Sequence, residues 1–409
     1  MQATSGTARG NGWDEIVVRV RREGLDEATI RGAICEGAFH VEIPILAELA
    51  SRDMAISIRG GDREEEISRV MDVVAGDAIL ITGQSNAVAM LTYESANAEQ
   101  NRFVRSFGSR TEVAADALAD GAWHIGDGDA ERGPGAIGQW ALRMGGRLIA
   151  QTGVPLAILN GARGGLPIEW LVRDDAAPAH PETYYGRLLM RAQRAGLADS
   201  VRAIMYSQGE SDTDAELHRT SFTSIHEDWR EDFPNVEHFY VVQIRACSLD
   251  DQIALREVQR QFAATLPRTT VMSANGVDGQ DGCHYHFEQG YAQIGNRFAR
   301  LLLRDLYGTR VRDTEAIDVV SARLAGDTIV IETRSDASTI VVDAGAEADF
   351  RLAGTSRQVT AVSVHGTSLE LALSPAMALP PKCRTSAISS AAAGSPTPIA
   401  SDCSRSFCP

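Results

Sequence analysis

Between residues 76 and 306, short apolar runs alternate with stretches of helical periodicity, and this alternation constrains the fold more than any other feature of the sequence. The first run, Ala-Ile-Leu-Ile-Thr at 78–82, is typical of a strand buried on both faces of a sheet. Further strands are expected at 155–160, 201–206, 238–244 and 269–272, and helices at 139–152, 222–232, 255–266 and 290–306. Such alternation predicts an α/β fold, with a parallel sheet covered by helices on both faces.

Short β-type runs flank this region on both sides. They lie at 15–20, 39–43 and 55–58 before it, and at 328–332 and 369–373 after it. Glycine-containing turns separate the early runs, as is typical of antiparallel strands. We therefore divide the chain into an N-terminal β-rich module (1–75), a hydrolase-type α/β domain (76–308), a C-terminal β-rich module (309–380) and a tail (381–409).

The tail differs in composition from the rest of the chain. It contains the only lysine, Lys382, and three of the six cysteines, at 383, 403 and 408, among many Ser, Ala and Pro residues. One interpretation is a disordered tail. The other is loss of the natural reading frame near Lys382, which would truncate the last β module, and the sequence leaves both open.

The composition excludes several classes of partner. A formal net charge of -16 opposes binding to nucleic acid or anionic lipid. There is no run of 18 or more apolar residues, so no membrane-spanning helix is expected. The six cysteines show neither metal-ligand spacing nor the pattern of a disulfide framework, and we expect the protein to depend on neither metal nor disulfide.

Four polar segments follow expected strands, at the sheet edge where open parallel sheets build their sites. The first, Gly-Gln-Ser-Asn at 83–86, comes directly after the first buried strand. Ser85 could simply cap the following helix. It could equally be a nucleophile, because a serine at a helix N-terminus exposes its hydroxyl beside free backbone N–H groups.

The second segment, at 160–170, contains paired glycines. Gly164 and Gly165 would let the backbone approach a ligand and present N–H groups to it. The alternative is a plain strand-to-helix turn with Pro167 in the first helical turn.

The third segment, at 206–212, contains an amide and a carboxylate after an apolar strand. Gln208 could donate its side-chain amide to an oxyanion. Glu210 fits three roles, namely a salt-bridge partner, a substrate ligand or a support for the site.

The fourth segment, at 281–286, places Asp281 three residues before His284. A carboxylate at this spacing can point at the histidine Nδ1, fix its tautomer and stabilise the imidazolium. Taken alone, the segment also fits a surface loop. Together the four segments supply a nucleophile, oxyanion donors, a base and its orienter, which are the roles of a serine acyl-transfer site.

These segments resemble the conserved blocks of the SGNH hydrolases. The matching blocks are Gly-Gln-Ser-Asn, Gly-Gly-x-Pro-Ile-Glu, Gln-Gly-Glu-Ser-Asp, and Asp-x-x-His followed by Gly-Tyr-x-x-Ile-Gly-x-Arg, in family order over residues 74–306. Within that superfamily the sequence is most similar to the sialate O-acetylesterase-like and carbohydrate esterase family 6 branch. The resemblance implies a three-layer α/β/α sandwich with a flavodoxin-like parallel sheet, flanked by small β modules.

The resemblance also implies the reaction and its residues. It implies cofactor-free and metal-free removal of O-acetyl groups from a carbohydrate, with Ser85, His284 and Asp281 as the catalytic triad. The oxyanion hole would combine the Ser85 N–H, a backbone N–H of Gly164 or Gly165, and Gln208.

Other residues of these segments are candidates for the sugar pocket. They are Arg163, Glu169, Trp170 and Glu210, although Trp170 could equally belong to the core. The sequence departs from the branch at Leu166, where threonine is usual, and at Ala87, where methionine is common. Both positions lie beside the expected site, so they bear on substrate choice rather than reaction type.

Two other functions fit the same segments. One is a catalytically idle carbohydrate-binding protein, and the other is an acyltransferase that moves acetyl between sugars. The sequence leaves the sugar, the acylated position and the oligomeric state open. The N-terminus lacks the pattern of a signal peptide, which makes the cytoplasm the default location, although relatives are often exported.

Overall fold

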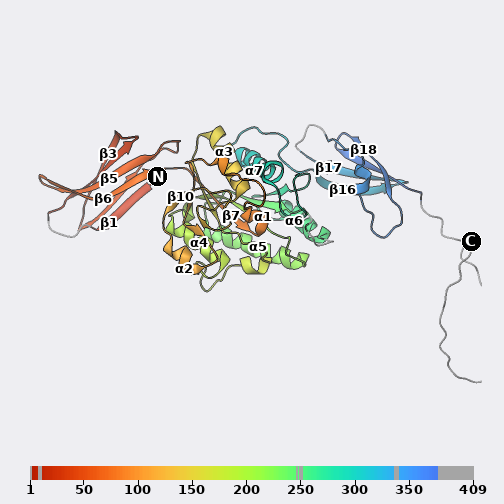
Figure 1. Cartoon of the computed structure of the whole chain (residues 1–409), viewed down its shortest axis with the longest axis horizontal. Coiled ribbons are helices and arrows are strands. Elements are labelled where there is room, and N and C mark those ends of the chain that lie inside the picture. Colours follow the sequence, from red (N-terminus) through yellow and green to blue (C-terminus); the bar gives the residue numbers. More distant parts are fainter. Residues whose placement is uncertain (1, 8–11, 246, 248–251, 336–339, 376–409) are drawn as a thin grey trace, which may run out of the picture. The chain divides into compact units, whose positions relative to one another are not determined.

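The computed structural model describes residues 2–7, 12–245, 247, 252–335 and 340–375, and for 2–7 the backbone alone (Figure 1). The chain divides into two compact units, which we describe separately. The first comprises the described residues up to Asp318 together with 334–335. The second comprises the other described residues, from Val319 onward.

The first unit contains a seven-stranded sheet with the strand order β10-β8-β12-β7-β13-β14-β15. These strands are β7 (Asp77–Gly83), β8 (Val104–Phe107), β10 (Trp123–Ile125), β12 (Leu156–Asn160), β13 (Val201–Ser207), β14 (His238–Gln243) and β15 (Thr269–Ser273). The strands from β8 to β15 in this order pair in parallel, and β10 is an antiparallel edge strand that the sequence did not predict. Five of these strands, β12-β7-β13-β14-β15, are neighbours in the sheet. When these five alone are numbered by their order along the chain, they run 2-1-3-4-5, which is the flavodoxin order.

Helices cover both faces of this sheet. They are α1 (Ser85–Val88), α2 (Ala114–Ala119), α3 (Gln139–Thr152), α4 (Tyr184–Arg194), α5 (Ala215–Asp232), α6 (Ile253–Thr265) and α7 (Ala292–Asp305). Ile79 and Ile81 of β7 pack into one apolar core with α3 and α7, whereas Leu80 faces a second core with α4, α5 and α6. The alternation along β7 therefore produces two cores, and the predicted α/β/α sandwich is confirmed.

Most predicted elements lie where the sequence placed them, and the differences have local causes. Helix α3 spans the predicted residues. Helix α5 begins before residue 222, because Asp214 caps it by accepting hydrogen bonds from the N–H groups of Glu216 and Leu217. Helix α7 begins after a π-helical turn at Phe287–Tyr291. Helix α4 was not predicted, since two arginines, Arg187 and Arg191, occupy its buried face.

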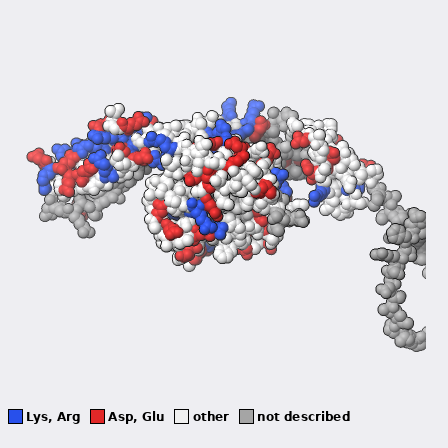
Figure 2. Space-filling model, in the orientation of Figure 1, with Lys and Arg blue, Asp and Glu red and all other residues white. Residues whose placement is uncertain are grey.

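The first unit also contains the N-terminal strands. Strands β2 (Glu15–Arg22), β3 (Leu25–Ala33), β5 (Arg52–Gly60) and β6 (Arg63–Val73) form an antiparallel sheet, and β1 (Gln2–Thr7) pairs with β4 (Ala38–Ile43). Ile16, Val18 and Ile58 lie in its core. Acidic and basic side chains intermingle on the face seen in Figure 2, and some form ion pairs such as Arg69–Glu66, at 2.7 Å.

The second unit consists mainly of β-structure. Strands β16 (Asp318–Ala325), β17 (Thr328–Arg334), β18 (Val359–His365) and β19 (Ser368–Leu373) form an antiparallel sheet in the order β16-β17-β19-β18. Short strands β9 (Ser109–Arg110) and β11 (Gly133–Pro134) pair in the first unit. The division into four segments stays a prediction, and the tail at 381–409 lies outside the described residues. Within the described ranges, no helix combines the length and hydrophobicity needed to span a bilayer.

Candidate active site

The first three polar segments lie at the carboxyl edge of the parallel sheet, where β7 stands between β12 and β13. This is the point at which the strand order reverses direction, and open α/β sheets bind their ligands there. Ser85 follows β7, Gly164 follows β12, and Gln208 follows β13. The fourth segment follows β15 and reaches the same edge through contacts described below.

Gly83 brings the first three segments close together. Its φ is +128°, and a Cβ at this position would lie 1.9 Å from the Ser207 carbonyl oxygen. The next residue, Gln84, donates its N–H to that carbonyl at 2.8 Å, and Arg163 N–H donates to the Gly83 carbonyl at 3.0 Å. Only glycine allows this approach, which sets the backbone direction into Ser85.

Gly164 lies beside the Ser85 side chain. A Cβ on Gly164 would be 3.5 Å from the Ser85 Cβ, whereas one on Gly165 would meet no atom within 4 Å. Among the backbone hydrogen bonds of the described residues, none uses the N–H of Ser85 or of Gly164. These two donors are therefore free to bind an oxygen near the Ser85 hydroxyl.

Asn160 is a supporting residue that sequence reasoning missed. Its buried side chain donates to the carbonyls of Ala87 and Ile137, both at 2.8 Å, and accepts from Ala162 N–H at 2.9 Å. It thereby joins helix α1, which begins at Ser85, to the segment that carries Gly164. Its place as the last residue of an apolar strand was the available signal.

Gln208 is buried, and its side-chain N–H groups contact protein atoms. Nε2 donates to the Leu166 carbonyl at 2.8 Å and lies 3.3 Å from Asp212 Oδ2. Asp212 also accepts from Ile168 N–H at 2.8 Å and contacts His218 Nδ1 at 2.7 Å. In this arrangement Gln208 supports the second segment, and its role as an oxyanion donor stays a prediction.

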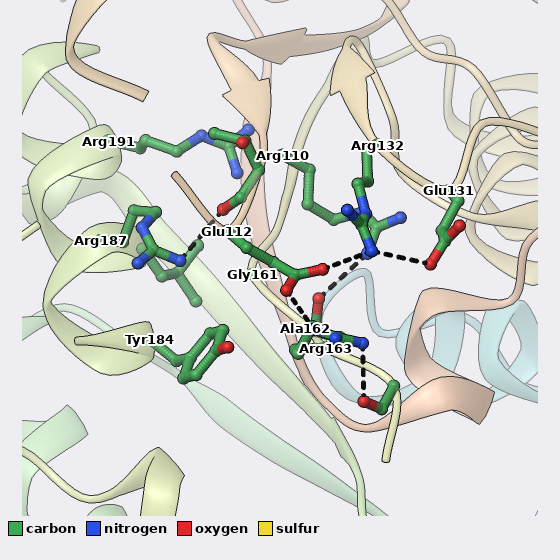
Figure 3. Close-up of a pocket in the computed structure, with 13 residues that line it drawn as sticks. Arg110, Glu112, Glu131, Arg132, Gly161, Ala162, Arg163, Tyr184, Arg187 and Arg191 are labelled. Carbon is green, nitrogen blue, oxygen red and sulfur yellow. Dashed lines mark hydrogen bonds and ion pairs between the residues drawn. The ribbon is translucent and has the colours of Figure 1, made fainter. Parts of the chain in front are cut away.

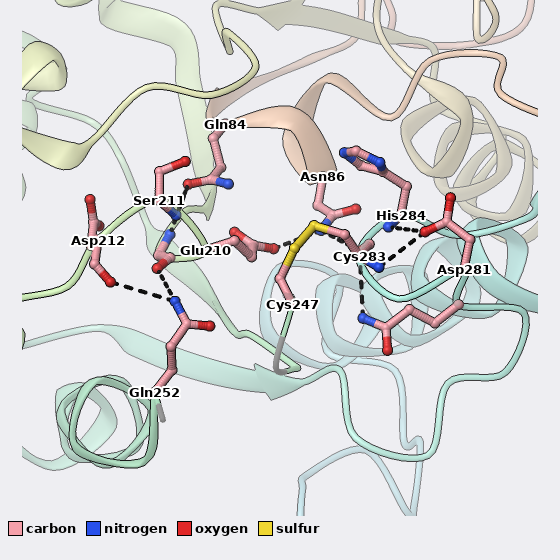
Figure 4. Close-up of a disulfide and its surroundings, with 12 residues drawn as sticks. Gln84, Asn86, Glu210, Ser211, Asp212, Cys247, Gln252, Asp281, Cys283 and His284 are labelled. Carbon is pink, nitrogen blue, oxygen red and sulfur yellow. Dashed lines mark hydrogen bonds between the residues drawn. A yellow bond between two sulfur atoms is a disulfide. The ribbon is translucent and has the colours of Figure 1, made fainter. Parts of the chain in front are cut away.

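Asp281 holds the loop that carries His284. Its Oδ1 accepts from the N–H groups of Cys283 at 3.0 Å and His284 at 2.8 Å (Figure 4). Its Oδ2 accepts from the Tyr93 hydroxyl at 2.7 Å. Burial acts to raise the Asp281 pKa, but these hydrogen bonds outweigh it and lower that pKa. In the described part of the chain, no hydrogen bond joins the His284 ring to Asp281 or to Ser85.

Asn86, the residue after Ser85, bonds to Cys283, the residue before His284. Its Nδ2 donates to Glu210 Oε1 at 2.6 Å and to the Cys283 carbonyl at 3.2 Å. Its Oδ1 accepts from the Tyr291 hydroxyl at 2.9 Å. Glu210 is buried, which raises its pKa, and of the three roles considered for it this contact favours support of the site.

A disulfide joins Cys247 to Cys283, so the expectation that the protein depends on no disulfide was wrong (Figure 4). The two residues are 36 apart in sequence, and their Cα atoms are 4.4 Å apart, within the range that a disulfide spans. Cys247 follows β14 and Cys283 follows β15, so the parallel sheet brings the two loops to one edge. Cysteine spacing alone could not show this proximity.

The remaining sugar-pocket candidates lie in the second segment. Arg163 pairs with Glu112 at 2.7 Å and donates to the Gly164 carbonyl at 2.8 Å. Trp170 is 62% exposed, which excludes the alternative that it belongs to the core. Glu169, beside it, is also exposed.

The parallel sheet in flavodoxin order, with a serine at its reversal point, is the arrangement expected of an SGNH-type hydrolase. The model of the family described as "Carbohydrate esterase, sialic acid-specific acetylesterase" matches residues 76–304. The chain therefore belongs to this family of carbohydrate esterases, and the resemblance found in the sequence is confirmed.

The chain is similar to several solved structures, and the first of those described here shows the same fold. A carbohydrate acetylesterase from Xanthomonas citri is 22% identical, with a TM-score of 0.62 over 90% of this chain and 86% of that one. A protein from Arabidopsis thaliana is 18% identical, with a TM-score of 0.45 over 56% of this chain and 99% of that one. An acetyl xylan esterase from Butyrivibrio proteoclasticus is 10% identical, with a TM-score of 0.32 over 75% and 87%. No curated protein matches the sequence.

Proposed function

We propose that this protein removes O-acetyl groups from a carbohydrate through an acyl-enzyme intermediate on Ser85. The observation that carries the proposal is the position of Gly164 beside Ser85, with the N–H groups of both residues free among the described backbone hydrogen bonds. Preorganised N–H donors beside a nucleophile are what a tetrahedral acyl-transfer intermediate requires.

In the proposed cycle, His284 takes the proton of the Ser85 hydroxyl as Ser85 Oγ attacks the acetyl carbonyl. The N–H groups of Ser85 and of Gly164 or Gly165, together with Gln208, stabilise the oxyanion. His284 then protonates the leaving sugar oxygen, and a water molecule attacks the acetyl-serine to release acetate. Asp281 orients the imidazole and stabilises its charged form.

The contacts of Asn86 support the proposal that Ser85 and His284 lie close together. Asn86 directly follows Ser85 and bonds to the carbonyl of Cys283, which directly precedes His284, at 3.2 Å. The proposal requires the His284 ring to bond to Asp281 and Ser85 when substrate is bound. Catalytic hydrogen bonds of unliganded enzymes are often long and tighten only in the substrate complex.

The proposal is tested by measuring hydrolysis of an aryl acetate and acetate release from acetylated sialic acid, xylan, xyloglucan and pectin fragments. We expect turnover by the wild type and its loss in Ser85→Ala. Ser221→Ala, on helix α5, serves as the matched control and should retain wild-type activity. Activity of Ser85→Ala close to that of the wild type would contradict the proposal.

Two further outcomes separate the other functions. An idle carbohydrate-binding protein would bind sugar but leave Ser85 unlabelled by a fluorophosphonate, because such a site has no activated nucleophile. An acyltransferase would place acetyl on an added sugar acceptor instead of releasing it as acetate.

A further inference from the structure

A pocket rich in arginine lies next to the proposed nucleophile. Arg187 and Arg191 of helix α4 contribute to one side of it, and Arg110, Arg132 and Arg163 contribute from other segments (Figure 3). Gly164 also lines the pocket. Because Gly164 lies beside Ser85, the pocket opens within reach of the proposed acyl site.

Three of these arginines have no carboxylate partner. Arg110, Arg187 and Arg191 are all buried, yet within the described ranges none forms an ion pair with an acidic side chain. All three guanidinium nitrogens of Arg187 and of Arg191 donate to backbone carbonyls, including those of Thr111 and Asn160. Buried charges in proteins are normally paired with an opposite charge, so three buried cations without a carboxylate partner around one pocket need an explanation.

Arg110 has donors left for a ligand. Its guanidinium bonds to the carbonyls of Ala162 at 3.0 Å and Ala130 at 3.4 Å, and its Nε has no partner. A guanidinium has five N–H donors, so most of those of Arg110 remain unused. Burial, followed by repulsion from Arg132 and Arg163, lowers the Arg110 pKa to about 10. A bound anion would relieve both effects.

The two acidic residues of the pocket lie toward the other arginines. Glu112 pairs with Arg132 at 2.7 Å and with Arg163 at 2.7 Å, and Glu131 lies 3.6 Å from Arg132. Glu112 therefore pairs with Arg132 and Arg163, and within the described residues it forms no ion pair with Arg110, Arg187 or Arg191. The pocket is lined by five arginines and two glutamates, in a protein whose net charge is -16.

We propose that Arg110 and Arg187, with the charge of Arg191 nearby, form a subsite for a carboxylate carried by the sugar substrate. The inference rests on the proposed function, because it places the carboxylate on the unit that bears the acetyl group or on its neighbour. Guanidinium groups match a planar carboxylate with paired N–H donors. The carboxylate belongs to a hexuronic acid or to a sialic acid, and the experiment below distinguishes these two sources.

The test measures binding directly. Glucuronate, N-acetylneuraminate and the uncharged methyl ester of glucuronic acid are titrated into the full chain at low salt, by calorimetry or NMR. We expect at least one acid to bind about tenfold or more tightly than the methyl ester, since charge-assisted hydrogen bonds are roughly twice as strong as neutral ones. The tighter of the two acids identifies the source of the carboxylate. Equal binding of acids and ester would overturn the proposal.

Variants that remove a positive or a negative charge distinguish an electrostatic effect on acid binding from a general loss of structure. Arg110→Gln and Arg187→Gln should each weaken binding of the preferred acid about tenfold or more. Glu112→Gln should tighten it several-fold, because it removes a competing carboxylate. A purely structural role predicts weaker binding in all three. If Arg110→Gln fails to fold, the opposite effects expected of Arg187→Gln and Glu112→Gln still distinguish carboxylate binding from a purely structural role.

A distant arginine provides the matched control. Arg202, at the amino end of β13, pairs with Asp77 at 2.7 Å. Arg202→Gln should leave acid binding unchanged, and losses equal to those of Arg110→Gln would overturn the proposal. Aryl acetate turnover without acid preference would contradict the subsite alone. Acid preference without turnover of any acetyl ester would contradict the proposed function alone.

Discussion

The side-chain amide of Asn86 donates to Glu210 Oε1 at 2.6 Å and joins two segments that are 124 residues apart in sequence. The same amide contacts the Cys283 carbonyl, so one side chain fixes the ends of two strands and the loop that carries His284. Glu210 is fully enclosed, and its Oε2 has no partner among the described residues. A buried carboxylate with a single contact is costly, which suggests that its task is to hold Asn86 in place.

Replacing Glu210 should therefore affect the site through Asn86. Glu210→Gln retains an acceptor for the Asn86 amide, whereas Glu210→Ala leaves an unsatisfied donor beside a cavity. We expect Glu210→Ala to lower the free energy of unfolding by about 2 kcal/mol, and kcat to fall more than KM changes. Urea denaturation and aryl acetate kinetics measure both effects. Equal behaviour of the two variants would contradict this role.

Glu210 should also make stability depend on pH. Burial raises its pKa in the folded protein, so the folded state binds the proton more tightly than the unfolded state. The protonated carboxyl stabilises the fold fully below the unfolded pKa of about 4.3, and this stabilisation is lost as the pH rises through the folded pKa. The free energy of unfolding of the wild type should therefore fall relative to Glu210→Gln as the pH rises. If the free energies of unfolding of the wild type and Glu210→Gln changed with pH in parallel, this prediction would be contradicted.

Gly83 should tolerate no side chain. A Cβ there would overlap the Ser207 carbonyl, and the positive φ adds strain. We expect Gly83→Ala to cost about 3 kcal/mol of stability and to reduce activity. Gly146, in helix α3, is the matched control because a Cβ there meets no atom within 4 Å. Gly146→Ala should stabilise the protein by about 0.5–1 kcal/mol, and similar losses in both variants would exclude the steric explanation.

The disulfide should stabilise the loop that carries His284. Cys247 and Cys283 are 36 residues apart in sequence, and closing a loop of this length stabilises a protein by about 3–4 kcal/mol in the chain-entropy model. Cys247→Ser should lower the melting temperature and reduce kcat. Cys35→Ser, which changes an exposed free cysteine, should do neither. A melting temperature that is the same with and without reductant would contradict this stabilisation.

The fold could be predicted because periodicity along the chain reports burial directly. Residues 78–82 read as a two-faced strand, and Ile79 and Leu80 do face different cores. Helix α4 was not predicted because Arg187 and Arg191 lie on its buried face, where their guanidinium groups donate hydrogen bonds to backbone carbonyls. No periodicity rule recognises an arginine as a core residue.

The site could be predicted only in part, because motifs name residues but not their contacts. Ser85, Gly164 and Gln208 follow the expected strands, as their spacing indicated. The Tyr93–Asp281 hydrogen bond and the Cys247–Cys283 disulfide depend on loops that meet only in the folded chain. The burial of Glu210, which favours one of its three candidate roles, is likewise not reported by the sequence.

The most direct test of the central claim is to trap the acyl-enzyme. The wild-type protein is mixed with an aryl acetate, quenched in acid during the first turnover, digested and analysed by mass spectrometry. We predict an acetyl group on the peptide that contains Ser85, and none on that peptide from Ser85→Ala. Release of acetate with no acetyl on Ser85, and with activity retained in Ser85→Ala, would contradict the account.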